Sequence, residues 1–393
     1  MSNSDAQDNP GTIRGELGPL LFITIIFLVN FIARVILSPL MPTVEKDLAL
    51  SHTYAGSLFL FIYLGYVAGL LGAGIASYYL THRMNIVLSA AVVGLALLEI
   101  ASSRSLWGIR LGLFFIGIGS GIYLPSGIAS ITSLIKMQHW GKALAVHELA
   151  PNLGFLSAPL ISEFLLTQYS WRGVLLIVGI ASLVLSLLFA FFGRGGNFRS
   201  ESPRFSSYRR LLSMPSFWVM AVLFVLGIGS TLGLYTMLPL FLVIEHGVDR
   251  SMANTIVSLS RLPGVGMVFL AGWARDRFGS KRTLELVFLI GGVITILLGF
   301  VPSSWVVVLV FMQPWVVGCF FPAGFAALSS IDPRGSSHFV VSLTLPVSTL
   351  LAAGVIPTWI GFMGDAGFFG MGIALFGALM VMGLIPLRYL NIK

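Results

Sequence analysis

Two arginines lie inside segments that are otherwise apolar enough to cross a membrane. Arg34 lies within residues 28–42 and Arg261 within residues 253–266. A charged side chain at the centre of a bilayer costs on the order of 3 kcal/mol even on the mildest scale, and such residues usually serve function. The planar guanidinium binds a carboxylate or phosphate through two parallel hydrogen bonds and does not lose its proton. The two arginines therefore predict a site for an anionic ligand.

No acidic residue lies one helical turn from either arginine. The chain has 15 acidic residues, and nearly all of them map to predicted loops or helix ends. Three lie within predicted apolar segments, each towards one end: Glu99, Glu148 and Glu163. Either arginine could instead bind backbone carbonyls, or Glu148 on another helix. We favour the interpretation that both arginines bind the negative charge of a substrate.

Polar side chains near the arginines extend the predicted binding site. Asn30 and Ser38 lie four residues before and after Arg34, and Ser258 lies three residues before Arg261. At this spacing each shares a helix face with its arginine. Tyrosines in apolar segments could donate hydrogen bonds to the same anion, namely Tyr63, Tyr123 and Tyr235.

A titratable pair opens the apolar segment 143–167. His147 and Glu148 lie near its start, and Asn152 follows one turn later. Histidine titrates near neutral pH, so this group could carry a coupling proton. The alternative is a polar pair at the membrane surface that holds an inner gate.

The composition defines the class of protein. Of the 393 residues, 56% are hydrophobic and only 10% are charged, with a mean hydropathy of +0.94, whereas soluble proteins are about one quarter charged. Cys319 is the only cysteine, which excludes an intrachain disulfide. The sequence has no nucleotide-binding loop and no metal-spaced cluster. We therefore expect a membrane protein that is not an enzyme, has no cofactor or metal, and takes its energy from a gradient.

Twelve apolar segments are long enough to cross a bilayer, which takes about 20 residues. They are residues 18–41, 53–79, 85–103, 107–134, 143–167, 172–193, 216–243, 252–274, 284–301, 305–330, 338–362 and 367–388. Outside them, basic residues favour the side that holds both termini by 16 to 5. The net charge of +8 thus reflects topology and not nucleic-acid binding. We expect a monomer in a bacterial cytoplasmic (inner) membrane, with both termini cytoplasmic.

The two halves of the chain repeat each other. Residues 121–134 match residues 318–331 at an offset of 197, where Gly, Pro, Gly, Ala and Ser coincide, and residues 74–84 match 272–282 at an offset of 198. Duplicated halves are typical of transporters whose site lies between them near the membrane midplane. The expected organisation is a cytoplasmic tail (1–17), a six-helix bundle (18–193), a basic cytoplasmic linker (194–215) and a second six-helix bundle (216–393).

A loop motif resembles that of a known family. The stretch GWARDRFGSKRTL (272–284) is similar to the G-x-x-x-D-R-x-G-[RK]-[RK] motif of the major facilitator superfamily, with Asp276 and Arg277 at its charged positions. The resemblance implies an all-α fold of twelve transmembrane helices in two pseudo-symmetric six-helix bundles. It also implies that Asp276 and Arg277 latch the bundles in one state. Tyr78 and Tyr79 occupy the matching positions in the first half, so we expect this latch to depend on the second half.

The arginine pattern looks like that of organic-anion and monocarboxylate-type members of this superfamily. Val257 stands where the monocarboxylate pattern has an aspartate, which argues against proton coupling by that route. Our leading hypothesis is a secondary transporter that moves a small organic anion, most simply a carboxylate, by alternating access, with H+ as a candidate coupling ion. The alternatives are an amphipathic drug/proton efflux antiporter, a porter of nitrate, nitrite or a cyanate-like inorganic anion, and a non-transporting receptor or scaffold.

Overall fold

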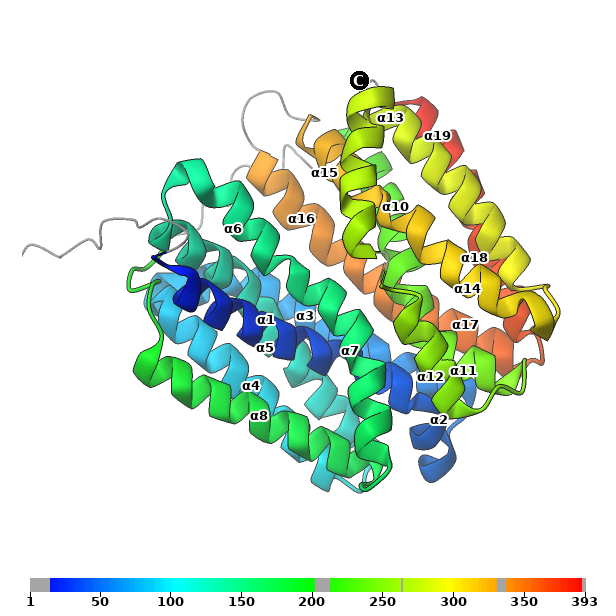
Figure 1. The fold of residues 1–393 in the computed structure, drawn as a ribbon, viewed down its shortest axis with the longest axis horizontal. Helices are drawn as coiled ribbons and strands as arrows, with labels where there is room; N and C mark the ends of the chain where they lie inside the picture. The colour runs from blue at the N-terminus through cyan, green and yellow to red at the C-terminus, as the bar shows by residue number, and fades with distance from the viewer. Residues whose placement is uncertain (1–14, 202–212, 263, 331–336, 391–393) are drawn as a thin grey trace, which may run out of the picture.

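The computed structural model describes residues 15–201, 213–262, 264–330 and 337–390, and for 264–276 and 337–342 it describes the backbone alone. Within these ranges the chain forms helices joined by short connections (Figure 1). A bilayer offers no water to backbone N–H and C=O groups, and a helix pairs them internally. Among the described residues, ten helical segments are long and apolar enough to cross a membrane. Two further spans lie along residues 250–298, which completes the predicted twelve.

The first six spans follow the predicted apolar segments. They are formed by α1 (Leu17–Val35) with α2 (Leu37–Leu48), α3 (His52–Tyr79), α4 (His82–Ser102), α5 (Leu106–Leu134), η1 (Met137–His139) with α6 (Trp140–His147) and α7 (Leu149–Leu166), and α8 (Trp171–Phe192). Serine side chains accept a backbone N–H at the start of three of them, at Ser51, Ser105 and Ser170. Such caps satisfy donors that a helix leaves unpaired at its first turn.

The last six spans contain more interruptions. They are formed by α10 (Pro215–Ile228), η2 (Gly229–Gly233) and α11 (Leu234–Ile244); α12 (Arg250–Leu259) and both parts of α13 (Gly264–Leu298); α14 (Ser303–Gly318) with α15 (Phe320–Ser329); α16 (Ser337–Leu350), η3 (Leu351–Val355) and α17 (Ile356–Asp365); and α18 (Phe369–Met382) with α19 (Leu384–Arg388). Gly279 divides α13 because its φ of 81° turns the backbone between two spans, a conformation that glycine adopts without steric cost.

The first span is longer than the sequence predicted. We expected it to end near residue 41, where the apolar segment ends. The helix instead continues through Pro42 to Leu48. The helix α2 packs against α11 of the second half, and Thr43 in the extension accepts a hydrogen bond from Arg250.

Several spans are irregular near the middle of the molecule. The first breaks at Ile36 between α1 and α2, and the fifth breaks at Glu148 between α6 and α7. The segments η2 and η3 are single turns of π-helix, and they contact each other. Short π-helical turns occur frequently at functional sites, since they disturb the regular backbone hydrogen bonds and re-aim side chains.

The two halves meet mainly at one end of the molecule. Figure 1 shows the helices of the first half, blue to green, on one side, and α2, α11, α12 and α17 gathered where the halves join. The contacting pairs include α2 with α11, α7 with α12, and α3 with α16, η3 and α17. The pair α3 and α17 approaches closely because Gly56 faces the backbone of Pro357 and Gly361 faces the backbone of His52. Small residues allow such approach between membrane helices.

This close contact makes a prediction about Gly56. A Cβ added there would collide with the carbonyl of Pro357, and overpacking of this kind costs about 1–3 kcal/mol. Gly56→Ala should therefore lower the melting temperature of the purified protein in detergent. Gly72→Ala is the matched control, since Gly72 lies on the same helix beside open space, and it should leave the melting temperature unchanged or slightly raised. Equal melting temperatures for the two variants would contradict the close contact.

Candidate functional site

Arg34 lies at the end of α1 and is almost fully buried, with 7% of its surface exposed. Its guanidinium carbon lies 4.9 Å from the ring centre of Phe31 and 4.5 Å from that of Tyr66. Tyr63, one turn before Tyr66 on α3, is fully buried, and its hydroxyl has no hydrogen-bond partner within the described chain. The first half thus contributes a cation that contacts two aromatic rings. A neighbouring helix adds a buried hydroxyl that has no hydrogen-bond partner within the described chain.

Arg261 has a similar setting in the second half. Its guanidinium carbon lies 4.9 Å from the ring centres of both Phe155 and Tyr235. One terminal nitrogen, Nη2, donates to the backbone oxygen of Thr231 at 3.3 Å. Thr231 belongs to the π-helical turn η2. The buried Nε of Arg261 has no partner in the part of the chain that the structure describes.

Aromatic rings connect the two arginines across the boundary between the halves. The rings of Phe31 and Phe155 lie edge to face at 4.9 Å between centres, and each carries one of the guanidinium groups. Because three steps of 4.9 Å join them, the two guanidinium carbons are at most about 15 Å apart. The structure therefore links the two arginines that the sequence singled out through a chain of contacting aromatic rings, which we call the aromatic layer.

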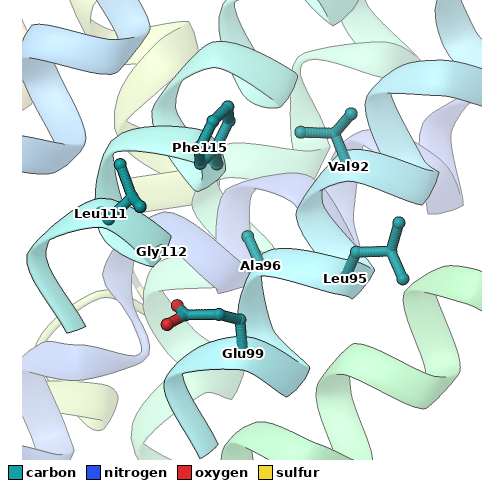
Figure 2. A pocket seen from close by; sticks show the side chains of 7 residues that line it. All are labelled: Val92, Leu95, Ala96, Glu99, Leu111, Gly112 and Phe115. Atoms are coloured by element: carbon teal, nitrogen blue, oxygen red, sulfur yellow. The ribbon is translucent and has the colours of Figure 1, made fainter. Parts of the chain in front are cut away.

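Neither arginine has an acidic partner among the residues that the structure describes. The three acids predicted in apolar segments lie elsewhere. Glu148 lies beside His147, and Glu163 binds Arg250. Glu99 lines a cavity of about 270 Å³ between α4 and α5, and Figure 2 shows its carboxylate among the side chains of Leu111 and Phe115 and other apolar residues. In this structure, the alternative that Glu148 neutralises an arginine is not realised.

The predicted serines and Asn30 form contacts of other kinds. Ser38 donates to the backbone oxygen of Tyr235 at 3.0 Å, and Ser258 donates to that of Leu156. Both hydrogen bonds join the first half to the second. Asn30 is buried and accepts from Ser89 at 3.4 Å, while its Nδ2 has no partner within the described residues. Asn30 is therefore the member of this group with a free donor.

Two of the predicted tyrosines have occupied hydroxyls. Tyr235 is fully buried and donates to the backbone oxygen of Phe155 at 3.1 Å. Tyr123 donates to the backbone oxygen of Ile23 at 2.7 Å. Of the three tyrosines, Tyr63 has the hydroxyl that is left to bind a ligand in this state.

His147 lies in a buried cluster with Tyr123 and Phe27. Its ring is fully buried and stacks on Phe27 at 4.4 Å. Its Nε2 lies 3.1 Å from the hydroxyl of Tyr123, and its Nδ1 lies 3.5 Å from Oε1 of Glu148. Asn152, the third predicted member, donates to the backbone oxygen of Glu148 at 3.3 Å on its own helix. The structure thus adds Tyr123 to the predicted proton-carrying group.

A polar cluster that no sequence pattern predicts joins the halves at the end opposite the termini. Arg250 donates to both carboxylate oxygens of Glu163, at 3.1 and 3.2 Å, and to Thr43 at 3.2 Å. Asn254 donates to Glu163 and to the backbone oxygen of Pro39. A second link between the halves is formed by Asp365, which accepts hydrogen bonds from the backbone of His52 and Thr53. We call the group of Glu163, Arg250, Asn254 and Thr43 the outer clasp.

The latch predicted from the loop motif lies at the other end. The side chain of Asp276 lies outside the described residues, although its backbone belongs to α13. Arg277 is exposed. Their role as a latch remains a prediction.

Comparison with known proteins assigns the family. The family model described as Major Facilitator Superfamily matches residues 23–357. The chain therefore belongs to the Major Facilitator Superfamily, and it is an integral, multi-pass membrane protein. The predicted fold and the resemblance to this family are confirmed.

Individual relatives differ in what their names describe. The chain is 25% identical to the "Probable sulfoacetate transporter SauU" of Cupriavidus necator over 373 residues. This alignment covers 89% of this chain and 82% of that protein. It is 23% identical to the "Membrane sensor protein UhpC" of Escherichia coli, over 78% of this chain and 74% of that protein. The crystal structure of a D-xylose-proton symporter superimposes on 94% of this chain and on 97% of its own chain, with a TM-score of 0.79 and 15% sequence identity. This likeness shows the fold alone.

The outer clasp leads to a prediction. Glu163→Gln removes the charge that Arg250 binds, so the halves should separate more readily at this end. The pair is partly exposed, with 37% of the Arg250 side chain accessible, so we expect a shift of roughly tenfold in the opening equilibrium, less than for a fully buried pair. The probe is Val44→Cys in a Cys319→Ser background, because Val44 is buried on α2.

The measurement is the rate at which a membrane-impermeant maleimide labels this cysteine. Asp47→Asn is the matched control, because Asp47 pairs with Arg172 at 3.2 Å within the first half. The rate should rise for Glu163→Gln and stay unchanged for Asp47→Asn. If both variants label at the parent's rate, the outer clasp does not hold the halves together.

Proposed function

We propose that this chain is a secondary transporter that moves a small organic anion, most simply a carboxylate, by alternating access. The observation that supports this proposal is the pair of arginines, Arg34 and Arg261, held between the halves without an acidic partner in the described chain. Their N–H groups can receive a carboxylate from both halves. Binding at this boundary would allow the anion to bias how the halves rock about it.

The surroundings of the arginines favour an organic anion over the alternatives. Four aromatic rings contact the two guanidinium groups, from Phe31, Tyr66, Phe155 and Tyr235. Such walls suit a ligand with an apolar body, whereas nitrate offers none. A cationic drug would require a carboxylate in this layer, and no acid among the described residues pairs with these arginines. The name of the relative SauU refers to sulfoacetate, an organic anion, which agrees with this class of substrate.

We also propose that His147 and Glu148 hold the coupling proton. Tyr123 donates its single hydrogen to Ile23, so the hydrogen between Tyr123 and His147 must belong to Nε2 of the histidine. Nδ1 then faces the Glu148 carboxylate at 3.5 Å. A bare nitrogen lone pair beside a carboxylate is repulsive, so this arrangement is favourable when a proton lies on one of the two groups. This arrangement supports the proposal that the pair holds one transferable proton.

A sensor is the second candidate function. The relative UhpC is named a membrane sensor protein, and the same arginine site could report an anion without moving it. Binding alone does not separate the two functions. Uptake by purified protein in liposomes does, because a sensor would bind the anion without accumulating it.

The arginine site predicts the effect of substitutions on affinity. Loss of one charge-assisted contact costs about 1.5–3 kcal/mol, so Arg34→Ala and Arg261→Ala should each weaken binding roughly 10- to 150-fold. Arg261→Lys should fall between Arg261→Ala and the parent, because lysine keeps the charge but loses the planar fork. The measurement is affinity for a panel of carboxylates, sulfonates, phosphates, nitrate and a cationic dye on purified, monodisperse protein.

Arg110→Ala serves as the control for this series. Arg110 also lies over aromatic rings, those of Tyr54, Phe61 and Trp107 at 5.0–5.6 Å, but it is not in the layer between the halves. It should alter stability more than affinity. Unchanged affinity in both alanine variants at the site, with thermal stability lowered, would assign the two arginines a structural role and remove the basis for an anion site.

The proton proposal predicts a selective loss in Glu148→Gln. The glutamine amide can donate to Nδ1 of His147 without a transferable proton, so the fold should survive. Exchange of labelled substrate across the membrane should continue, while accumulation driven by an imposed pH gradient should fall to the level without a gradient. Glu99→Gln, which changes a peripheral acid of the same half, should behave as the parent does. If the pH gradient drives Glu148→Gln as well as the parent, Glu148 carries no coupling proton.

A further inference from the structure

A second charged site lies far from the arginine layer, where the final part of α13 meets α19. A cavity of about 460 Å³ opens between them. Its lining includes two arginines, Arg282 and Arg388, and one acid, Glu285. Three leucines form an apolar wall of the same cavity, namely Leu286, Leu289 and Leu384.

The backbone fixes the two arginines opposite each other. Arg282 follows the turn at Gly279 and lies at the start of the final part of α13, and Arg388 is the last residue of α19. Lys281 donates to the backbone oxygens of Arg388 and Leu390, at 3.3 and 3.0 Å. These bonds hold the end of α19 against the start of the other helix, so the two guanidinium groups share one cavity.

The cavity carries excess positive charge. Arg282 and Arg388 are both exposed, and neither side chain forms an ion pair or a hydrogen bond with the part of the chain that the structure describes. Glu285 lies one turn after Arg282 without pairing with it within the 4 Å of a salt bridge. The lining thus holds two arginines and one carboxylate, which gives it a net positive charge. The site is therefore complementary to an anion.

The apolar wall distinguishes this anion from a free ion. Leu286 and Leu289 are each 45% exposed on the membrane-spanning part of α13. At 1.5 Å per residue, Leu289 lies about 10 Å along the helix from Arg282, which is the direction from the membrane surface towards the acyl chains. A ligand that uses the whole cavity must have an anionic head and an apolar chain.

We propose that this cavity binds an anionic phospholipid from the leaflet at the end of the molecule that holds the termini. The phosphate of the lipid meets Arg282 and Arg388, and its acyl chain lies along Leu286 and Leu289. Basic pockets between transmembrane helices have the chemistry that anionic head groups require. The site lies apart from Arg34 and Arg261, so this proposal does not depend on the transported substrate.

The test uses the purified full-length protein and two lipids of equal chain length, phosphatidylglycerol and phosphatidylcholine. Binding is counted by native mass spectrometry. The parent should retain phosphatidylglycerol in preference to phosphatidylcholine. The double variant Arg282→Gln/Arg388→Gln should bind phosphatidylglycerol roughly 10- to 30-fold more weakly, from the loss of two charges near the head group. The double variant with lysine at both positions should retain most of the binding.

Controls separate this site from general attraction of anionic lipid. Lys136→Gln removes one exposed charge at the same end of the molecule and should leave binding unchanged. Inorganic phosphate at the same concentration should not displace the lipid. Equal phosphatidylglycerol binding by the parent and the double glutamine variant would overturn the proposal, and displacement by inorganic phosphate would show a site for a free anion instead.

Discussion

The structure depends on two guanidinium groups that are held inside a membrane protein without a described acidic partner. Each rests on two aromatic rings at 4.5–4.9 Å, and a desolvated contact of this kind contributes about 1–2 kcal/mol. Two such contacts approach the mildest cost of an intramembrane charge, on the order of 3 kcal/mol. The ring faces stabilise the charge, but they accept few hydrogen bonds from the N–H groups of the guanidinium. Those N–H groups are what an incoming anion can bind.

Interruptions in the helices place the polar groups around this layer. The first span breaks at Ile36, two residues after Arg34, and the fifth breaks beside His147. The π-helical turn that contains Thr231 presents its carbonyl to Arg261. Irregular backbone in a membrane is tolerated where protein surrounds it, which ties these breaks to the boundary between the halves.

Sequence alone predicted the fold because both hydropathy and duplication can be detected without knowing which helices pack together. It also identified both arginines, since a charge within an apolar segment is visible without a structure. It could not pair Arg250 with Glu163, because 87 residues separate them and no spacing rule connects residues on different helices. For the same reason the link between Tyr123 and His147 was missed, although both residues were singled out. The end of the first span was misplaced because the apolar segment ends before the helix does.

The most direct measurement is a structure determined with a bound carboxylate, chosen as the tightest ligand of an affinity panel and labelled with bromine for identification. Our account predicts that the carboxylate lies in the aromatic layer, within hydrogen-bond distance of Arg34, of Arg261 or of both, and that no side-chain carboxylate of the protein takes its place. A ligand bound elsewhere, with both arginines still resting on Phe31, Tyr66, Phe155 and Tyr235 alone, would contradict it.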